Sequence, residues 1–349
     1  MNLYIFNIFR FIAAVIVILF HMQYTYPFLK NIPKIFLAGP QMVTFFFVLS
    51  GFVLVLSSAK YEKIPTMNFI KKRVSKLYPI YFISLLPIIA ISIVLGKLDI
   101  SNIIIDLAFL QSWIPPYALK LNGPAWYLST LTALYIAFPF IYNYIKERKI
   151  ENINVLYASL LIWSITQIII VLLLNSSFYQ GYPSISHDFL YYFPLAHFGS
   201  FFLGIAGALF VSNIKIMYSK IVRYSTFLSI LGILILSIEY ENKINTVLGF
   251  DIPFGSSFYA PLFLLLVISV NTLNETVIEN KFLKIITFLG AISYPLYVLQ
   301  APVKLVLSAL FKKYEVTEHI AFLVYSMSLF LISYLILKYL DKILVKVFK

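Results

Sequence analysis

Long apolar segments, separated by short polar ones, run through almost the entire chain. A helix that crosses the hydrocarbon core of a bilayer needs roughly 20 predominantly apolar residues. Ten segments reach or approach that length, and the pattern therefore predicts an all-α, polytopic bundle of about ten transmembrane helices. The ten segments are Leu3–Tyr24, Ile35–Ser58, Leu77–Gly96, Ala125–Ile145, Ile153–Leu174, Phe189–Val211, Tyr224–Ile238, Pro253–Thr272, Ile285–Leu310 and His319–Tyr339.

Two apolar segments need separate interpretation. Ile103–Trp113 is apolar, but it is too short to span and carries Asp106, so we expect a re-entrant or interfacial piece. The first segment lacks the basic start and the cleavage site of a signal peptide, so we interpret it as a span. No stretch is long enough for a soluble domain, and residues 1–349 are predicted to form one membrane domain.

The composition agrees with the pattern. Hydrophobic residues make up 61% of the 349 residues and charged residues 12%, and the mean hydropathy is +0.91. Soluble domains have about 45–50% apolar and about 25% charged residues. An ordinary soluble enzyme is therefore excluded, and we expect a multi-pass protein of a plasma or inner membrane whose first partner is the lipid bilayer.

The chain also lacks several signatures of chemistry. It has no cysteine, which excludes disulfides, thiolate metal sites and cysteine nucleophiles. It shows no Walker motif, no dinucleotide-binding glycine pattern and no histidine pair at metal-binding spacing. We therefore expect neither ATP-driven transport nor NAD chemistry, no metal site and no permanently bound cofactor.

The net charge of +13 is distributed unevenly along the chain. If the N-terminus is inside, the inner segments 60–76, 146–151, 212–223, 273–284 and 338–349 hold 18 basic residues and the outer loops hold 8. Cytoplasmic loops of membrane proteins are enriched in Lys and Arg, so both termini are predicted to be cytoplasmic. The same bias accounts for the excess of positive charge without a nucleic-acid partner.

A cationic residue and a histidine lie inside the first predicted span. Arg10 and His21 are 11 residues apart, which places them only about 20° apart around a helix and about 16 Å apart along it. Charged and titratable groups inside a membrane are costly and are usually functional. The alternative is that Arg10 extends to the inner interface and His21 is a polar anchor near the outer one.

A basic cluster precedes the third span. It contains Lys72, Arg73 and Lys76, with Arg73 and Lys76 one turn apart. The simpler interpretation is a topology anchor. The functional interpretation is a phosphate-binding site, which we expect at the N-terminus of a helix, where backbone amides also favour anions.

Two more segments combine turns with polar or aromatic residues. Residues 122–129 form a Gly-Pro turn followed by Trp126, Tyr127 and Ser129, which is also typical of an interfacial aromatic belt. In the ninth span, Tyr297 and Gln300 share one helical face between two prolines, so a polar cavity is plausible. We expect His187 to be solvated and His197 to be a hydrogen-bonded core residue.

Five short motifs follow one another along the chain: Arg10 to His21, residues 45–52, Arg73 to Pro79, residues 123–129 and residues 293–297. Together they resemble the acyltransferase family 3 membrane proteins, whose members O-acylate sugars of cell-surface polysaccharides. The resemblance implies an enzyme that moves an acyl group, and first of all acetyl from cytoplasmic acetyl-CoA, to a hydroxyl of a surface or lipid-linked glycan.

The resemblance also implies roles for individual residues. His21 and Arg10 would be catalytic, with His21 as general base or as covalent acyl carrier. Arg73, Lys76 and Lys72 would bind the donor. The acceptor would be bound by Trp126, Ser129, Tyr297 and Gln300.

The chain departs from the family pattern at several positions. Lys76 stands where Arg is usual, residues 130–132 replace a common pair of Glu, and Gln300 replaces a common His. Asp106 is then the nearest candidate to orient His21.

A polysaccharide-precursor flippase or small-solute transporter, with the same buried charges along a substrate pathway, remains the alternative from another functional class. A glycan polymerase is a third, less expected because the outer loops are short.

Overall fold

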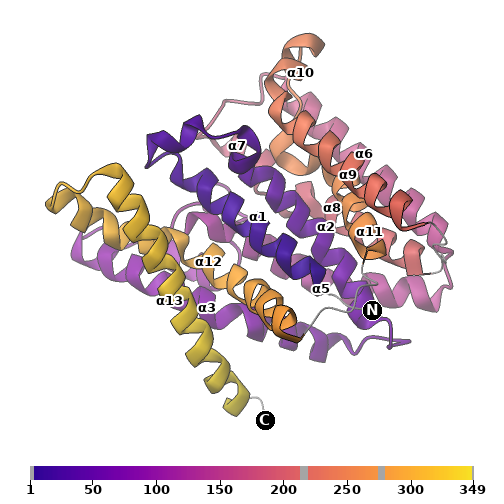
Figure 1. Cartoon of the computed structure of the whole chain (residues 1–349), viewed down its shortest axis with the longest axis horizontal. Coiled ribbons are helices and arrows are strands. Elements are labelled where there is room, and N and C mark those ends of the chain that lie inside the picture. Colours follow the sequence, from indigo (N-terminus) through magenta and orange to yellow (C-terminus); the bar gives the residue numbers. More distant parts are fainter. Residues whose placement is uncertain (1–3, 213–218, 274–279, 348–349) are drawn as a thin grey trace.

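The computed structural model describes residues 4–212, 219–273 and 280–347, and every regular element within them is helical. Figure 1 shows the elements as one bundle of long, roughly antiparallel helices with short connections. The predicted all-α architecture is therefore confirmed. The α-helices are α1 (Ile5–Met22), α2 (Gly39–Ser58), α3 (Thr66–Val94), α4 (Ile100–Leu107), α5 (Trp126–Glu147), α6 (Asn152–Leu174), α7 (Ile185–Tyr191), α8 (Pro194–Ser212), α9 (Lys220–Glu239), α10 (Glu241–Leu248), α11 (Ala260–Thr272), α12 (Asn280–Lys313) and α13 (Glu318–Val347). Short 3₁₀ or π turns lie at η1 (Pro27–Asn31), η2 (Lys34–Leu37), η3 (Gly123–Ala125) and η4 (Phe254–Phe258).

Within the described residues, nine helical segments are long and apolar enough to cross a bilayer. They correspond to nine of the ten predicted spans, and the protein is a multi-pass membrane protein. The tenth, Pro253–Thr272, contains only the 13-residue helix α11. Ser257 adopts a left-handed backbone conformation (φ 67°) and interrupts the helix before Ala260.

Helix α3 begins 11 residues earlier than the predicted third span, at Thr66 rather than Leu77. Pro65 occupies the position before the helix, and the polar segment that follows continues directly into the apolar one. Arg73 and Lys76 are therefore the eighth and eleventh residues of the helix. The expectation that they lie at a helix N-terminus is wrong, because free backbone amides occur only in the first turn.

The segment after α3 does not span. Asp99 caps α4 by accepting hydrogen bonds from the backbone amides of Ser101 (2.9 Å) and Asn102 (3.4 Å). Helix α4 has only 8 residues, and the chain then continues without a long helix to Gly123. This agrees with the short interfacial or re-entrant piece predicted for Ile103–Trp113.

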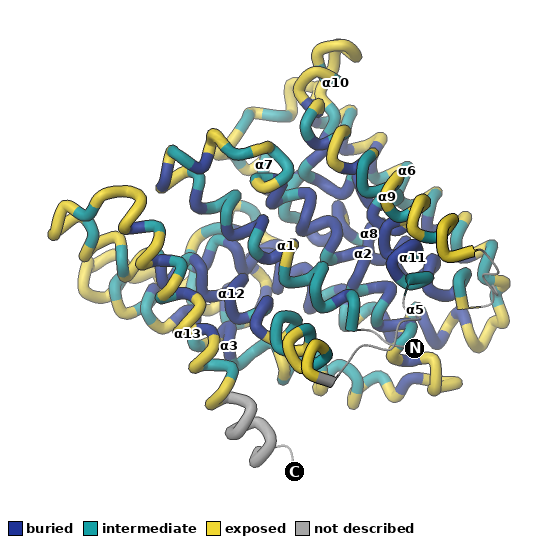
Figure 2. Tube along the Cα trace, viewed as in Figure 1, coloured by how far each residue is buried: buried dark blue, intermediate teal, exposed yellow. Residues whose placement is uncertain are grey.

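Helices α2 and α8 form the centre of the bundle. A side chain at Gly51 would overlap the carbonyl oxygen of Phe201, and one at Gly204 would overlap that of Val48. The two backbones are therefore in direct contact, which is how small residues join helices where water provides no driving force. Figure 2 shows both helices as largely buried.

The outer helices present apolar side chains to the surroundings. Only 11% of the α9 span and 22% of the α6 and α13 spans is buried inside the protein. Helix α12 packs between α1, α3 and α13. The centre of the bundle is thus surrounded by helices whose other faces meet lipid.

Candidate functional site

Two cations from different helices come together near one end of the bundle. Arg10 of α1 lies within electrostatic range of Arg73 of α3, and also of Tyr127 and Tyr135 of α5. The Arg73 guanidinium lies over the rings of Phe69 (5.2 Å) and Tyr135 (5.9 Å). The resemblance implies a catalytic role for Arg10 and donor binding for Arg73, and the structure places the two side chains near each other.

Aromatic hydroxyl groups surround this pair of cations. Ser50 of α2 forms a hydrogen bond with the Tyr127 side chain. Tyr294 of α12 lies within electrostatic range of Tyr127 and Tyr135, and its hydroxyl donates to the Leu77 carbonyl (2.5 Å). Five helices thus contribute to one polar region inside the bundle.

Within the described part of the chain, the two arginines have no carboxylate partner. The ion pairs among the described residues are Lys34–Glu241 (2.8 Å) and Lys63–Glu147 (2.7 Å), and neither involves Arg10 or Arg73. Two half-buried guanidinium groups within electrostatic range of each other repel, and a bound anion would offset both that repulsion and the loss of hydration. The site therefore has the charge pattern of an anion-binding site.

The other two predicted donor residues lie differently. Lys72 and Lys76 are on the exposed side of α3, whereas Arg73 is half-buried. The structure thus separates Arg73, which joins Arg10, from the two lysines beside it.

His21 lies toward the other end of α1. Its ring is half-buried and contacts the Phe20 ring edge-on at 5.2 Å. Lys304 of α12 is within electrostatic range. Among the described residues, none forms a hydrogen bond with the His21 ring nitrogens, so the imidazole is not held as a structural link between helices.

Asp106 does not orient His21, and that expectation is wrong. Its Oδ1 accepts a hydrogen bond from the Tyr81 hydroxyl (3.1 Å), and its Oδ2 has no partner among the described residues. The carboxyl group is held against α3, because Tyr81 also donates to the Asp106 backbone carbonyl (2.9 Å). Burial without a cation raises the pKa of Asp106 to about 7.

The four predicted acceptor residues are buried and engaged within the protein. The Ser129 hydroxyl donates to the Phe109 carbonyl (2.5 Å) and accepts from the Ser112 amide (3.3 Å). The Tyr297 hydroxyl donates to the Pro124 carbonyl (2.6 Å). Gln300 donates to the Tyr297 carbonyl (2.8 Å), while its Oε1 has no partner among the described residues.

Trp126, the fourth of these residues, packs against other rings. Its ring centroid lies 5.0 Å from that of Tyr192 and 5.2 Å from that of His197. Ser129 and Tyr297 thus hold the segment 109–126 against α5 and α12. The contact of all four residues with an acceptor stays a prediction.

The remaining histidines of interest are structural. His197 is a buried core residue, as expected: its Nε2 donates to the Tyr191 carbonyl and its Nδ1 accepts from the Ser257 hydroxyl, each at 3.0 Å. His187 was expected to be solvated, but it is half-buried, stacks on Tyr191 (4.4 Å) and bonds the Tyr179 hydroxyl (3.1 Å). The reason is that residues 185–191 form α7, which packs tyrosines around the ring.

Sequence reasoning did not single out Tyr127, Tyr135, Tyr294 or Ser50 as site residues. With 26 tyrosines in the chain, an interfacial belt explains most of them equally well. Only the packing of α1, α2, α3, α5 and α12 separates these residues from the others.

Comparisons with known proteins bear on what the site does. A family described as an acyltransferase domain matches residues 3–338. Acyltransferase MdmB of Streptomyces mycarofaciens is 29% identical over 123 residues, which are 33% of this chain and 31% of that protein. The aligned part thus spans about a third of the length of that relative. No solved structure matches the chain.

Proposed function

The chain belongs to this acyltransferase family, and we propose on that premise that it is a membrane O-acyltransferase that moves an acyl group from acyl-coenzyme A to a glycan hydroxyl. Acetyl-CoA is the donor we expect first. The donor enters from the basic, cytoplasmic end of the bundle, and the acceptor is a surface or lipid-linked glycan at the other end.

The observation that carries this proposal is the pair of arginines, for which the described residues supply no carboxylate partner. Coenzyme A bears several phosphate groups, and Arg binds phosphate through two parallel hydrogen bonds. Arg10 and Arg73 approach each other from two helices and have no anionic partner among the described residues. The phosphates of the donor supply the missing negative charge, and Lys72 and Lys76 extend the positive surface toward the cytoplasm.

The reaction itself takes place near His21. The acceptor hydroxyl oxygen attacks the thioester carbonyl carbon, the carbon–sulfur bond breaks, and the new ester bond forms. His21 takes the hydroxyl proton as general base and returns it to the departing thiolate. Because about 16 Å of helix separates Arg10 from His21, the pantetheine arm of the donor lies along α1.

In this proposal, the buried residues around the Gly-Pro turn act by holding a neighbouring segment in place. Ser129 and Tyr297 hold the segment 109–126, which borders the acceptor, and Trp126 and Gln300 are packed beside them. This role fits side chains whose polar groups bond the backbone of that segment.

A direct experiment separates acyl transfer from transport. Membranes with and without the protein are incubated with acetyl-CoA radiolabelled in the acetyl group, and the glycan fraction is isolated. We expect label in base-labile ester linkage on the glycan only when the protein is present. Movement of glycan across the membrane without labelling would replace this proposal with the transporter.

A second experiment addresses the donor site. Arg73→Ala removes a charge-assisted phosphate contact, so binding of acyl-CoA weakens by about 1–3 kcal/mol. Lys71→Ala, at an exposed position of the same helix, is the matched control. Lys76→Arg keeps the charge and is tolerated. Unchanged transfer by Arg73→Ala at limiting donor would leave the cluster as a topology anchor only.

A further inference from the structure

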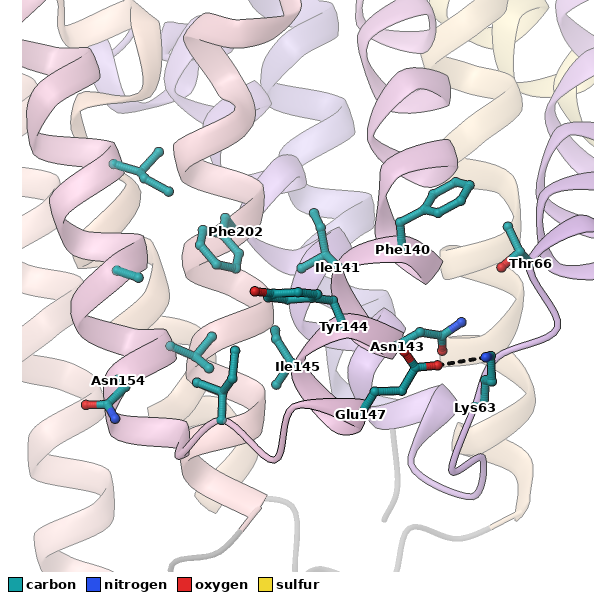
Figure 3. Close-up of a pocket in the computed structure, with 14 residues that line it drawn as sticks. Lys63, Thr66, Phe140, Ile141, Asn143, Tyr144, Ile145, Glu147, Asn154 and Phe202 are labelled. Atoms are coloured by element: carbon teal, nitrogen blue, oxygen red, sulfur yellow. Dashed lines mark ion pairs between the residues drawn. The ribbon is translucent and has the colours of Figure 1, made fainter.

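A groove of about 900 Å³ lies between α5 and α6, away from the arginine pair. One wall is α5, with Phe140 and Tyr144, and the other is α6, with Ala158 and Ile162. Phe202 of α8 lies between them. Figure 3 shows Tyr144 extending into the space between the helices, with Lys63 and Glu147 at one end.

The groove exists because two consecutive helices do not close on each other. Only residues 148–151 connect α5 to α6, and antiparallel helices with so short a connection usually pack side by side. Here α6 packs on α8, whereas α5 packs on α3 and α8, and the two helices do not pack extensively on each other. The space between them is lined on the α6 side by residues at helical spacing, from Asn154 and Val155 through Ala158 to Ile162.

This groove opens to the surroundings of the bundle, which in a membrane protein are lipid. Phe140 and Tyr144 are 60% and 58% exposed, and Ala158 is exposed as well. Apolar walls at membrane depth offer water no hydrogen-bond partners. If the groove were empty, the side chains that line it would lose dispersion contacts along its whole length. A hydrocarbon chain is the occupant that the walls fit.

The end of the groove near the α5–α6 turn is polar. Lys63 forms an ion pair with Glu147, but their side chains are 71% and 55% exposed, and such exposed pairs contribute little. The Asn143 side chain is already engaged, since it bonds both the amide (2.8 Å) and the carbonyl (3.0 Å) of Ile64. Lys63 is therefore the group that can turn to a phosphate at the level of the lipid headgroups.

The surroundings of that end are basic. Segments 60–63 and 146–151 together carry five cationic and three acidic side chains. Positive charge next to a membrane attracts anionic lipids.

We propose that this groove is a binding site for one anionic phospholipid of the bilayer. An acyl chain lies between α5 and α6, and the phosphate lies at Lys63. This inference does not depend on the acyl-transfer proposal, because none of its residues belongs to the arginine pair or surrounds His21.

Lipid retention tests the position of the chain. The full-length protein is purified in a mild detergent, washed extensively, and its bound phospholipid is identified and counted by native mass spectrometry. Ala158→Phe fills the groove at an exposed position, so the fraction of protein that retains phospholipid should fall several-fold. Leu161→Phe, on the same helix and 61% exposed outside the groove, should retain lipid as the wild type does. Equal retention by Ala158→Phe and the wild type would overturn the site.

Headgroup selectivity tests the position of the phosphate. In vesicles that contain equal amounts of anionic and zwitterionic phospholipid, the wild type should retain the anionic one preferentially. Lys63→Gln should lose this preference, and Lys60→Gln, on the same loop but outside the groove, should keep it. Retention of both lipids in equal amounts by the wild type would overturn the assignment of the phosphate to Lys63.

Discussion

At the residue scale, the imidazole rings of His21 and His197 differ in the hydrogen bonds that their ring nitrogens form. His197 uses both ring nitrogens within the core, whereas no described residue forms a hydrogen bond with His21. A ring nitrogen that is left unoccupied by the fold is available to take a proton. The proposal that His21 is the base follows from this contrast together with its position on the face of Arg10.

The first prediction is therefore that His21→Ala inserts and folds normally but loses acyl transfer by about 10²–10⁴-fold, the usual contribution of a general base. His21→Gln should fail as well, because an amide keeps a hydrogen bond but does not carry the proton. Initial rates of acetyl transfer are compared at matched expression. Wild-type rates in His21→Gln would contradict the catalytic role and leave a structural bond, worth about 0.6 kcal/mol on average between membrane helices.

The second prediction concerns Asp106. Its pKa is raised by burial to about 7, so the folded state holds a proton that the unfolded chain releases near pH 4. The stabilisation from this proton is complete below about pH 4 and is lost as the pH rises through 7. Asp106→Asn is neutral throughout and keeps the acceptor for Tyr81. Its thermal stability in detergent should change less between pH 5 and pH 8 than that of the wild type. Parallel pH profiles for the two proteins would show that Asp106 is ionised in the fold.

The two arginines and Asp106 show which contacts of single residues could be predicted from the sequence and which could not. The shared face of Arg10 and His21 follows from their spacing alone, since helical periodicity determines it. The approach of Arg10 to Arg73 required α12, which packs on both α1 and α3, and the motifs indicated it only through resemblance. The partner of Asp106 is Tyr81, a contact between two helices that no local pattern encodes, and the expectation of a link to His21 was wrong for that reason.

At the scale of elements, helix positions were predictable from apolar length, but helix starts and interruptions were not. The apolar window located α3, yet the helix includes the polar residues from Thr66 because nothing after Pro65 breaks it. The predicted span at Pro253–Thr272 contains no charged residue, but η4 and the left-handed Ser257 leave only α11. Tertiary bonds fix that interruption: the Ser257 amide donates to Thr44 and its carbonyl accepts from Trp163.

The third prediction concerns the crossing of α2 and α8. Gly204→Ala places a methyl group against the Val48 carbonyl, so the helices must separate and the fold should lose about 1–3 kcal/mol, as overpacked cores do. Gly232→Ala in α9 meets no atom within 4 Å and should be neutral or slightly stabilising. Thermal unfolding of both variants in detergent gives the comparison. Equal midpoints would mean that the crossing has room to adjust.

At the scale of the whole molecule, the bundle has a basic end and a less basic one, and its direction in the membrane decides where donor and acceptor bind. The direction of the bundle in the membrane rests on the distribution of Lys and Arg along the chain. The proposed donor site at Arg10 and Arg73 requires that this end of the bundle face the cytoplasm, where acyl-CoA is present.

The fourth prediction tests this direction. The chain has no cysteine, so a single introduced thiol is the only one present. Tyr182→Cys, at a 65% exposed position near His187, should react with a membrane-impermeant maleimide in intact cells. Arg148→Cys, in the α5–α6 turn, should react only after the cells are permeabilised. Reaction of both thiols from the same side would overturn the cytoplasmic placement of the termini.

The contact between α2 and α8 has a consequence for biosynthesis. Gly51 and Gly204 are separated by roughly 150 residues, which a ribosome adds in about 10–30 s. During that time α2 resides in the membrane while the helix that completes its innermost face has not yet been made. Final assembly therefore depends on lateral association between helices that enter the membrane at different times, and a ribosome that stalls before α8 leaves the glycine face of α2 uncovered.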